Sequence, residues 1–217
     1  MTLPLFAEEE IALPDGAALF RGELDRAAQI ALLDDVAVIL GEAPPLRLCM
    51  RNGTPLVNAM TNCGPLGWYS DRQGYRYIDR HPETGRPWPA IPARLRALSD
   101  RLMGRVGVRG YEPDACLVNL YGADGRLSLH QDHDEVDFRW PIVSVSLGAE
   151  ASFLLGGRTR KDKTQDIRLR SGDVVVLHGP GRTLFHGVKR VWPGTSPLAH
   201  PALDDFARIN LTLRRAR

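Results

Sequence analysis

The feature of this sequence that most restricts its fold is a series of short β-rich runs, which begins near Asp114 and continues to the C-terminus. Glycine, proline and charged turns separate the runs, and β-branched or aromatic residues fill them, a pattern typical of strands. Seven or eight strands are expected. The clearest runs are ACLVNLY, PIVSVSLG, ASFLLGG, DIRLR, DVVVLHG, RTLFHGV and ARINLTLR.

Two amphipathic helices are expected before these strands. Apolar residues recur at helical spacing within Leu24 to Leu40, and Gly41 and Pro44 are stop signals after it. Pro92 opens a second helix, which Gly107 can end. The apolar stripes are Leu24, Ala28, Leu32, Val36 and Ile39 in the first helix and Leu95, Leu98, Leu102 and Val106 in the second.

Helices followed by many short strands predict a mainly-β chain of the α+β class. The expected architecture is a double-stranded β-helix, or jelly roll, with the N-terminal helices packed outside it. A chain of 217 residues suits a single domain with a real core. Its expected parts are an extension with a helix (about 1–45), a loop-rich segment (46–90), a supporting helix (91–112) and the jelly-roll core (113–217).

The distribution of charge indicates a polyanionic partner. The net charge is only +2, but residues 1–45 carry nine acids against two bases. Residues 46–110 reverse this, with eleven arginines against four acids and several interleaved tyrosines and tryptophans. This mixture suits a nucleic acid whose bases can stack on aromatic rings, although a solvated arginine-rich surface would look the same.

Other compositional features exclude several classes of protein. No apolar run is long enough to span a bilayer, and Met1 to Glu10 lacks the features of a signal peptide, so we expect a cytoplasmic protein without membrane contact. Cys49, Cys63 and Cys116 are widely spaced, which favours free thiols over disulfides or a thiolate zinc site. A hydrophobic content of 43% and a charged content of 25% argue against disorder.

A candidate metal site lies in the segment LSLHQD. His130 and Asp132 are two residues apart in an expected strand, so their side chains point to one face. An isolated HxD is a weak signal, but His186 follows in the run RTLFHGV. Two imidazoles and one carboxylate form the facial triad of non-haem iron(II) oxygenases. His178 is the competing third ligand, but it lies in an expected turn, so we favour His186.

The last strand offers a polar face to a polar ligand. In RINLTLR, Arg208, Asn210, Thr212 and Arg214 alternate with three apolar residues. If this face points inward, a small dicarboxylate can lie between the two arginines; a solvent-exposed face is the alternative. Asn119 and Tyr121 in ACLVNLY have the same spacing and could hydrogen-bond a carboxylate held on the facing sheet.

Nine blocks of the chain resemble the AlkB family of 2-oxoglutarate-dependent dioxygenases, especially its bacterial members. One departure is His133, where these members usually have lysine. The blocks are AMTNCGPLGW (59–68), RQGY (72–75), RPWPAIP (86–92), PDACLVNLY (113–121), LSLHQDHDE (127–135), PIVSVSLG (141–148), GDVVV (172–176), FHG (185–187) and RINLTLR (208–214).

The resemblance implies a role for each candidate residue. It implies that residues 46–90 form a nucleotide-recognition lid. The implied iron(II) ligands are His130, Asp132 and His186; the implied 2-oxoglutarate contacts are Asn119, Tyr121, Arg208, Asn210 and Arg214; the implied substrate contacts are Trp68, Tyr75, Asp134 and Arg160.

The resemblance also implies an activity. With Fe(II), O2 and 2-oxoglutarate, the enzyme would oxidise alkyl groups on bases such as 1-methyladenine and 3-methylcytosine, releasing formaldehyde, succinate and CO2. Single- or double-stranded DNA is the expected partner, with RNA as a further substrate, and the enzyme is expected to act as a monomer. The alternatives are the same chemistry on RNA or protein, and a non-catalytic jelly-roll module that binds nucleic acid.

Overall fold

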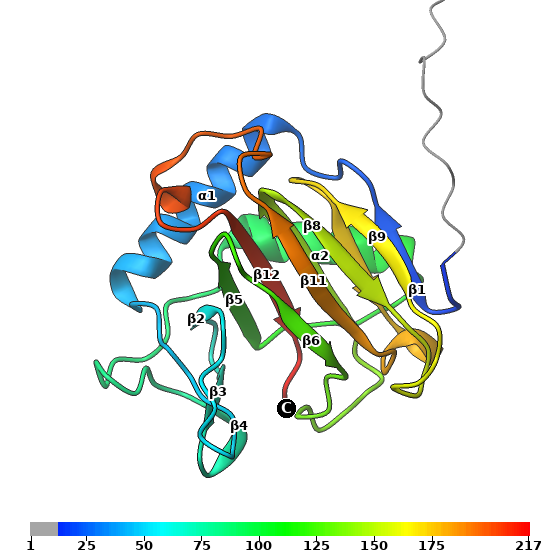
Figure 1. The fold of residues 1–217 in the computed structure, drawn as a ribbon, viewed down its shortest axis with the longest axis horizontal. Helices are drawn as coiled ribbons and strands as arrows, with labels where there is room; N and C mark the ends of the chain where they lie inside the picture. Colours follow the sequence, from blue (N-terminus) through cyan, green and yellow to red (C-terminus); the bar gives the residue numbers. More distant parts are fainter. Residues whose placement is uncertain (1–12) are drawn as a thin grey trace, which may run out of the picture.

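Two facing β-sheets make up the centre of the computed structural model, which describes residues 13–217 (Figure 1). Within these residues the major sheet has the order β1-β10-β7-β12-β5-β2, the minor sheet has the order β6-β11-β8-β9, and β3 and β4 form a separate hairpin. The strands are β1 (Ala17–Phe20), β2 (Ala59–Cys63), β3 (Gly67–Asp71), β4 (Gly74–Ile78), β5 (Ala115–Tyr121), β6 (Leu127–His130), β7 (Ile142–Gly148), β8 (Glu150–Leu155), β9 (Gln165–Leu169), β10 (Val174–Leu177), β11 (His186–Trp192) and β12 (Arg208–Arg214).

The first helix, α1, spans Arg26–Glu42 rather than the predicted Leu24 to Leu40. Its start is set by Asp25, whose carboxylate accepts a hydrogen bond from the backbone N–H of Ala28 at 2.8 Å and so caps the helix. Gly41 lies inside the last turn, since a single glycine weakens a helix by only about 1 kcal/mol. The predicted apolar stripe is confirmed by its burial from Leu32 onward.

The second helix, α2, spans Ala93–Arg105 and begins directly after Pro92, as predicted. Gly107 follows its end with a φ of +73°, a conformation that favours glycine. Both helices pack on the outer face of the major sheet, so the predicted jelly roll with external helices is confirmed. The buried residues at this interface include Leu32, Val36 and Ile39 of α1, Leu95, Leu98 and Leu102 of α2, and Ile209, Leu211 and Leu213 of β12.

A second core fills the space between the two sheets. It contains Phe153 and Leu155 from β8 in the minor sheet, and Val175 and Leu177 from β10 in the major sheet. Because side chains alternate along a strand, each strand of the major sheet contributes one face to the helices and the other to this inner core. The inward face of β12 is the polar one.

The sequence did not predict two strands of the major sheet. β1 pairs with β10 and β2 pairs with β5, so the segments 1–45 and 46–90 each supply an edge strand. Residues 1–12 lie outside the described residues. They include Met1 to Glu10, the stretch from which we expect no signal peptide. No helix within residues 13–217 is long and apolar enough to cross a membrane.

The run RTLFHGV is not a strand along its whole length. A 3-10 helix, η1 (Gly179–Gly181), continues into a turn in which the N–H of Leu184 bonds to the carbonyl of Gly181 at 3.1 Å. β11 therefore begins at His186, whereas the sequence predicted a strand that ends there. The apolar residues Leu184 and Phe185 predicted a strand. The glycines and proline at residues 179–181 instead start a turn that continues to Leu184, so the strand begins only at His186.

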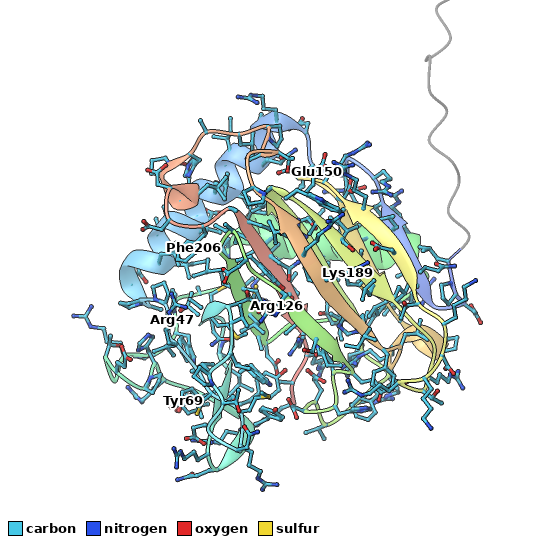
Figure 2. All side chains as sticks on the ribbon, in the orientation of Figure 1. Arg47, Tyr69, Arg126, Glu150, Lys189 and Phe206 are labelled. Carbon is cyan, nitrogen blue, oxygen red and sulfur yellow. The ribbon has the colours of Figure 1, made fainter. Side chains whose placement is uncertain are left out.

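The hairpin β3–β4 projects beside the β2 edge of the major sheet (Figure 1). Its base is anchored by Asn62 of β2, which exchanges two hydrogen bonds of 3.0 Å with the backbone of Trp68. The indole N–H of Trp88 also donates to the carbonyl of Ile78 at 2.9 Å. These bonds hold the hairpin against the open end of the jelly roll. Figure 2 shows Tyr69 on the hairpin, well apart from Lys189 on the minor sheet.

Candidate active site

The predicted metal ligands lie on or just after two neighbouring strands of the minor sheet, β6 and β11. His130 ends β6 and His186 begins β11, and the two residues are direct partners across these antiparallel strands. Asp132 follows β6. The candidate ligand atoms of the three residues lie within 4.8 Å of one another, and Nε2 of His186 is 3.6 Å from Oδ2 of Asp132. The structure thus places the three side chains as one cluster.

Both imidazoles are oriented for metal binding. Nδ1 of His130 lies 2.9 Å from the carbonyl of Ser128, and Nδ1 of His186 lies 2.9 Å from the carbonyl of Leu184. A carbonyl oxygen only accepts hydrogen bonds, so each Nδ1 carries the proton and each Nε2 keeps its lone pair. The free lone pairs face Asp132, which is the arrangement that second-sphere hydrogen bonds produce at histidine metal sites.

Asp132 has the charge and the free atom that a cation requires. It is 7% exposed, and its Oδ2 has no hydrogen-bond partner within the described residues. Burial alone would raise the pKa of Asp132, but the nearby positive groups together outweigh burial and hold this pKa far below its usual range; Arg214 contributes most, followed by the two histidines and Arg182. Burial lowers the pKa of His186 to about 4. An anionic carboxylate and a neutral imidazole are the forms that bind iron(II).

The polar face of β12 points into the cavity, as the alternation predicted. Arg208, Asn210 and Arg214 are all less than 10% exposed. Asn119 and Tyr121 lie directly opposite Asn210 and Arg208 on β5. β5 and β12 are neighbours in the same sheet, so the expectation that Asn119 and Tyr121 serve a ligand on a facing sheet was wrong; they extend the same polar surface sideways.

Arg208 is a buried cation that lacks an acidic partner among the described residues. Its guanidinium donates to Oγ of Ser146 at 2.7 Å and to the carbonyl of Ala149 at 3.1 Å, and its Nε donates to nothing. Burial lowers the pKa of Arg208 to about 10. Burial also raises the pKa of the phenol of Tyr121 to about 12. A bound carboxylate would supply the missing negative charge, so the surface fits a dicarboxylate such as 2-oxoglutarate.

The hairpin β3–β4 contributes an aromatic pair to the cavity. The rings of Trp68 and Tyr75 are stacked with centroids 5.5 Å apart. The indole N–H of Trp68 donates to Oδ2 of Asp134 at 2.7 Å, which ties the hairpin to the loop that carries Asp132. Flat aromatic faces beside a carboxylate suit a base that carries a positive charge and an amino group.

All of the predicted site residues line one cavity of about 720 Å³. Arg160 is among them and its guanidinium lies 5.2 Å from the ring centroid of Phe185. His178 is not among them; it precedes η1, and it is absent from the metal-ligand cluster found in residues 13–217. His133 is exposed at the rim, where its Nε2 lies 2.8 Å from Oε1 of Gln131.

Sequence reasoning missed a buried network that supports the site. Arg214 donates to Oδ1 of Asp132 at 2.9 Å. Arg182 donates to the backbone carbonyl of Asp132 at 3.1 Å and to Oε2 of Glu135 at 2.9 Å. The hydroxyl of Tyr77, on the lid, donates to Oε1 of Glu135 at 2.6 Å. These residues come from separate segments, and no local pattern in the sequence joins them.

Two serines were also missed, although a signal for them existed. Ser144 and Ser146 alternate with valines in β7, a central strand, and so must face the inner cavity or its wall. Oγ of Ser144 accepts a hydrogen bond from Nδ2 of Asn210 at 2.8 Å, and Ser146 accepts from Arg208. Polar residues at alternate positions of a central strand predict a polar cavity.

Comparisons with known proteins agree with this geometry. Residues 16–214 match the model of the 2OG-Fe(II) oxygenase superfamily. The chain is 48% identical over 215 residues to the alpha-ketoglutarate-dependent dioxygenase AlkB homolog of Caulobacter vibrioides, covering 99% of this chain and 94% of that one. It is 42% identical over 217 residues to alpha-ketoglutarate-dependent dioxygenase AlkB of Escherichia coli, covering 99% and 98%.

A solved structure, that of OsALKBH1, superposes with a TM-score of 0.78 at 30% identity and covers 94% of this chain and 100% of that one. The superfamily model names both Fe(II) and 2-oxoglutarate, the names of the full-length relatives give the same co-substrate, and the cluster of two histidines and one aspartate fits the metal. This chain therefore belongs to the AlkB family, and it is a dioxygenase that depends on Fe(II) and 2-oxoglutarate.

Proposed function

We propose that this enzyme removes alkyl groups by oxidation from N-alkylated bases in DNA, such as 1-methyladenine and 3-methylcytosine, and that it accepts RNA as well. The observation that carries this proposal is the single cavity in which the metal-ligand cluster, the unpaired Arg208 and the aromatic lid meet. A protein that only bound nucleic acid would not need a metal-ligand cluster and an unpaired buried arginine beside the aromatic pair.

His130, Asp132 and His186 hold the iron, and Asn119, Tyr121, Arg208, Asn210 and Arg214 hold 2-oxoglutarate. When bound, iron and 2-oxoglutarate supply the activation of dioxygen that oxidises the alkyl carbon, and succinate and CO2 are the by-products. The hydroxylated carbon then leaves the base nitrogen as formaldehyde. This chain's own residues are required for binding, orientation and exclusion of water rather than for acid–base catalysis.

Trp68 and Tyr75 enclose the alkylated base, and Asp134 accepts a hydrogen bond from its amino group. Asp134 already accepts such a bond from Trp68, so an entering base competes for, or shares, this carboxylate. Alkylation at N1 of adenine or N3 of cytosine gives a cationic base, which a carboxylate and aromatic faces prefer over the neutral base. Arg160 also lines the cavity, and we assign its guanidinium to contact with the substrate.

We propose one catalytic domain over residues 1–217, with residues 46–90 as the lid and 113–217 as the jelly-roll core, acting as a monomer. The hairpin β3–β4 supports the lid assignment, because it forms a sheet separate from the jelly roll and carries Trp68 and Tyr75, which line the cavity.

RNA is the second candidate substrate, because the names of more distant relatives include a tRNA demethylase beside a DNA demethylase. DNA N(6)-methyladenine demethylase ALKBH1A of Arabidopsis thaliana is 38% identical over 182 residues, which are 76% of this chain and 53% of that protein. The tRNA demethylase abh1 of Schizosaccharomyces pombe is 33% identical over 160 residues, or 70% of this chain and 53% of that protein.

The test is formaldehyde release from oligonucleotides that contain 1-methyladenine or 3-methylcytosine, with Fe(II), ascorbate and 2-oxoglutarate. Matched DNA, RNA and methylated-peptide substrates are compared for the wild type, Asp132→Ala and the exposed-site control Asp124→Ala. We expect release with the DNA and RNA substrates but not with the peptide, and only from the wild type and the control. Consumption of 2-oxoglutarate without formaldehyde would reject the substrate class while keeping the chemistry.

A further inference from the structure

A second, smaller cavity opens on the lid beside the active site. Its volume is about 260 Å³ and its walls are formed by Arg51, Gln73, Gly74, Tyr75 and Asp134. Tyr75 and Asp134 also line the large cavity, so the two spaces share a wall. A ligand that enters the large cavity can therefore extend into the small one. The cationic wall of this smaller cavity is formed by Arg51, which is not one of the predicted site residues.

Two turns of the lid interlock to form that side. A β-carbon added to Gly53 would lie 3.2 Å from Nη2 of Arg72, and one added to Gly74 would lie 3.7 Å from Nε of Arg51. Each glycine thus leaves room for the arginine of the other turn. Both glycines also have positive φ, +84° and +113°, so the turns themselves favour glycine. This packing places each exposed guanidinium group beside the opposite turn of the same segment.

Neither Arg51 nor Arg72 forms an ion pair within residues 13–217. Asp71, which directly precedes Arg72, is already engaged by Arg76 through bonds of 2.7 and 2.8 Å. The hydrogen bond from Arg76 lowers the pKa of Asp71 to about 2. The guanidinium groups of Arg51 and Arg72 are exposed and therefore available to an anion, which their positive potential attracts.

The opposite wall restricts what that anion can be. Asp134 would repel a ligand that is anionic throughout, and the ring of Tyr75, which is 50% exposed, offers a flat apolar face. The ligand must therefore combine an anionic group for Arg51 with a base or amine for Tyr75 and Asp134. A nucleotide unit of a nucleic-acid strand has both.

We propose that this cavity is a phosphodiester subsite, in which Arg51 binds the phosphate next to the flipped nucleotide and Arg72 adds to the local positive potential. The proposal rests on the proposed function, since it assumes that a nucleic-acid base occupies the large cavity. It assigns to the lid a contact with the strand in addition to its contact with the base. Gln73 supplies a neutral hydrogen-bond donor on the same wall.

The experiment measures equilibrium binding of a fluorescently labelled, unmodified single-stranded oligonucleotide at several salt concentrations. We expect Arg51→Ala to weaken binding by about three- to tenfold. It should also lower the slope of log affinity against log salt by about 0.7, the value for one phosphate contact on a single strand. Arg51→Lys, which keeps the charge, should recover most of both, and Arg72→Ala should have the smaller effect.

Arg86→Ala is the matched control, because Arg86 is an exposed arginine of the same segment that lines neither cavity. It should bind as the wild type does. An Arg51→Ala protein with wild-type affinity and slope, or an equal loss in Arg86→Ala, would overturn the subsite. The subsite would also be rejected if Arg51→Ala raised the KM of a methylated nucleoside, which has no phosphate, as much as that of a methylated trinucleotide.

Failure of the proposed function gives a different result. In that case the wild type would release no formaldehyde from any methylated strand. The binding measurements with unmodified strand would still test the phosphate contact of Arg51, because they do not depend on the reaction.

Discussion

Arg214 donates a hydrogen bond of 2.9 Å to Oδ1 of Asp132, so a residue that faces the co-substrate also holds a metal ligand. The same oxygen lies 3.7 Å from Nε2 of His130, and only Oδ2 is left without a partner. Arg214 therefore selects which carboxylate oxygen remains for the metal. Because both groups are buried, this orientation is fixed before any ligand binds.

Glu135→Gln should destabilise the protein severely. Glu135 is buried between Arg182 and Arg214, and its loss leaves two buried guanidinium groups with less compensating charge. We expect the free energy of unfolding to fall by about 3–5 kcal/mol, measured by urea denaturation. The control is Glu23→Gln, which breaks pairs with Arg101 and Arg105, whose side chains are 54% and 52% exposed and so remain hydrated; it should cost about 1 kcal/mol or less. Equal losses in the two variants would contradict the role assigned to burial.

Tyr77→Phe should loosen the lid with little loss of global stability. The change removes only the hydroxyl that joins β4 to Glu135, while the ring keeps its packing. We expect faster hydrogen exchange in β3 and β4, and more 2-oxoglutarate consumed per formaldehyde released. Tyr69→Phe removes a hydroxyl from the neighbouring strand and should change neither quantity. Wild-type exchange rates in Tyr77→Phe would show that this bond does not restrain the lid.

Arg208→Met should separate stability from function. Methionine has a similar length and removes a buried charge that has no acidic partner in the described residues, so the stability of the ligand-free protein should change by no more than about 1–2 kcal/mol in either direction. The increase in melting temperature that 2-oxoglutarate produces in the wild type should disappear. Retention of that increase would mean that the co-substrate does not bind at Arg208. Leu211→Ala, in the helix-facing core, should show the reverse pattern.

The stability of the metal-free protein should fall as the pH decreases from 6.5 towards 4. Burial lowers the pKa of His186 from 6.5 to about 4. Between these values the unfolded chain takes up a proton that the folded protein does not, so acid favours unfolding, and the contribution is complete only above pH 6.5. This contribution is about 3 kcal/mol at most.

The measurement is the urea midpoint at several pH values in the presence of a chelator, for the wild type and His186→Gln. Carboxylates also titrate near the lower end of this range, but they do so in both proteins, so the difference between the two pH dependences isolates His186. Parallel curves between pH 6.5 and pH 5 would contradict the depressed pKa.

The sequence alone predicted both external helices, most strands of the jelly roll and the polar face of β12, because each depends on an apolar repeat of two or 3.6 residues along the chain. It also identified the three candidate metal ligands, since His130 and Asp132 are two residues apart and a second histidine, His186, completes the set. The positions of β1 and β2 could not be predicted, because an edge strand is defined by the partner it pairs with rather than by its own residues.

Only the tertiary structure decided how the site is supported. Tyr77, Glu135 and Arg182 look like ordinary polar residues in the sequence, and their ion pairs exist because the fold buries them together where water cannot compensate their charges. The same is true of Arg51, whose importance depends on a glycine more than twenty residues away and on a cavity that no local pattern describes. Periodicity specifies which face of a strand is polar, but the partners of a buried charge are fixed only when distant segments pack.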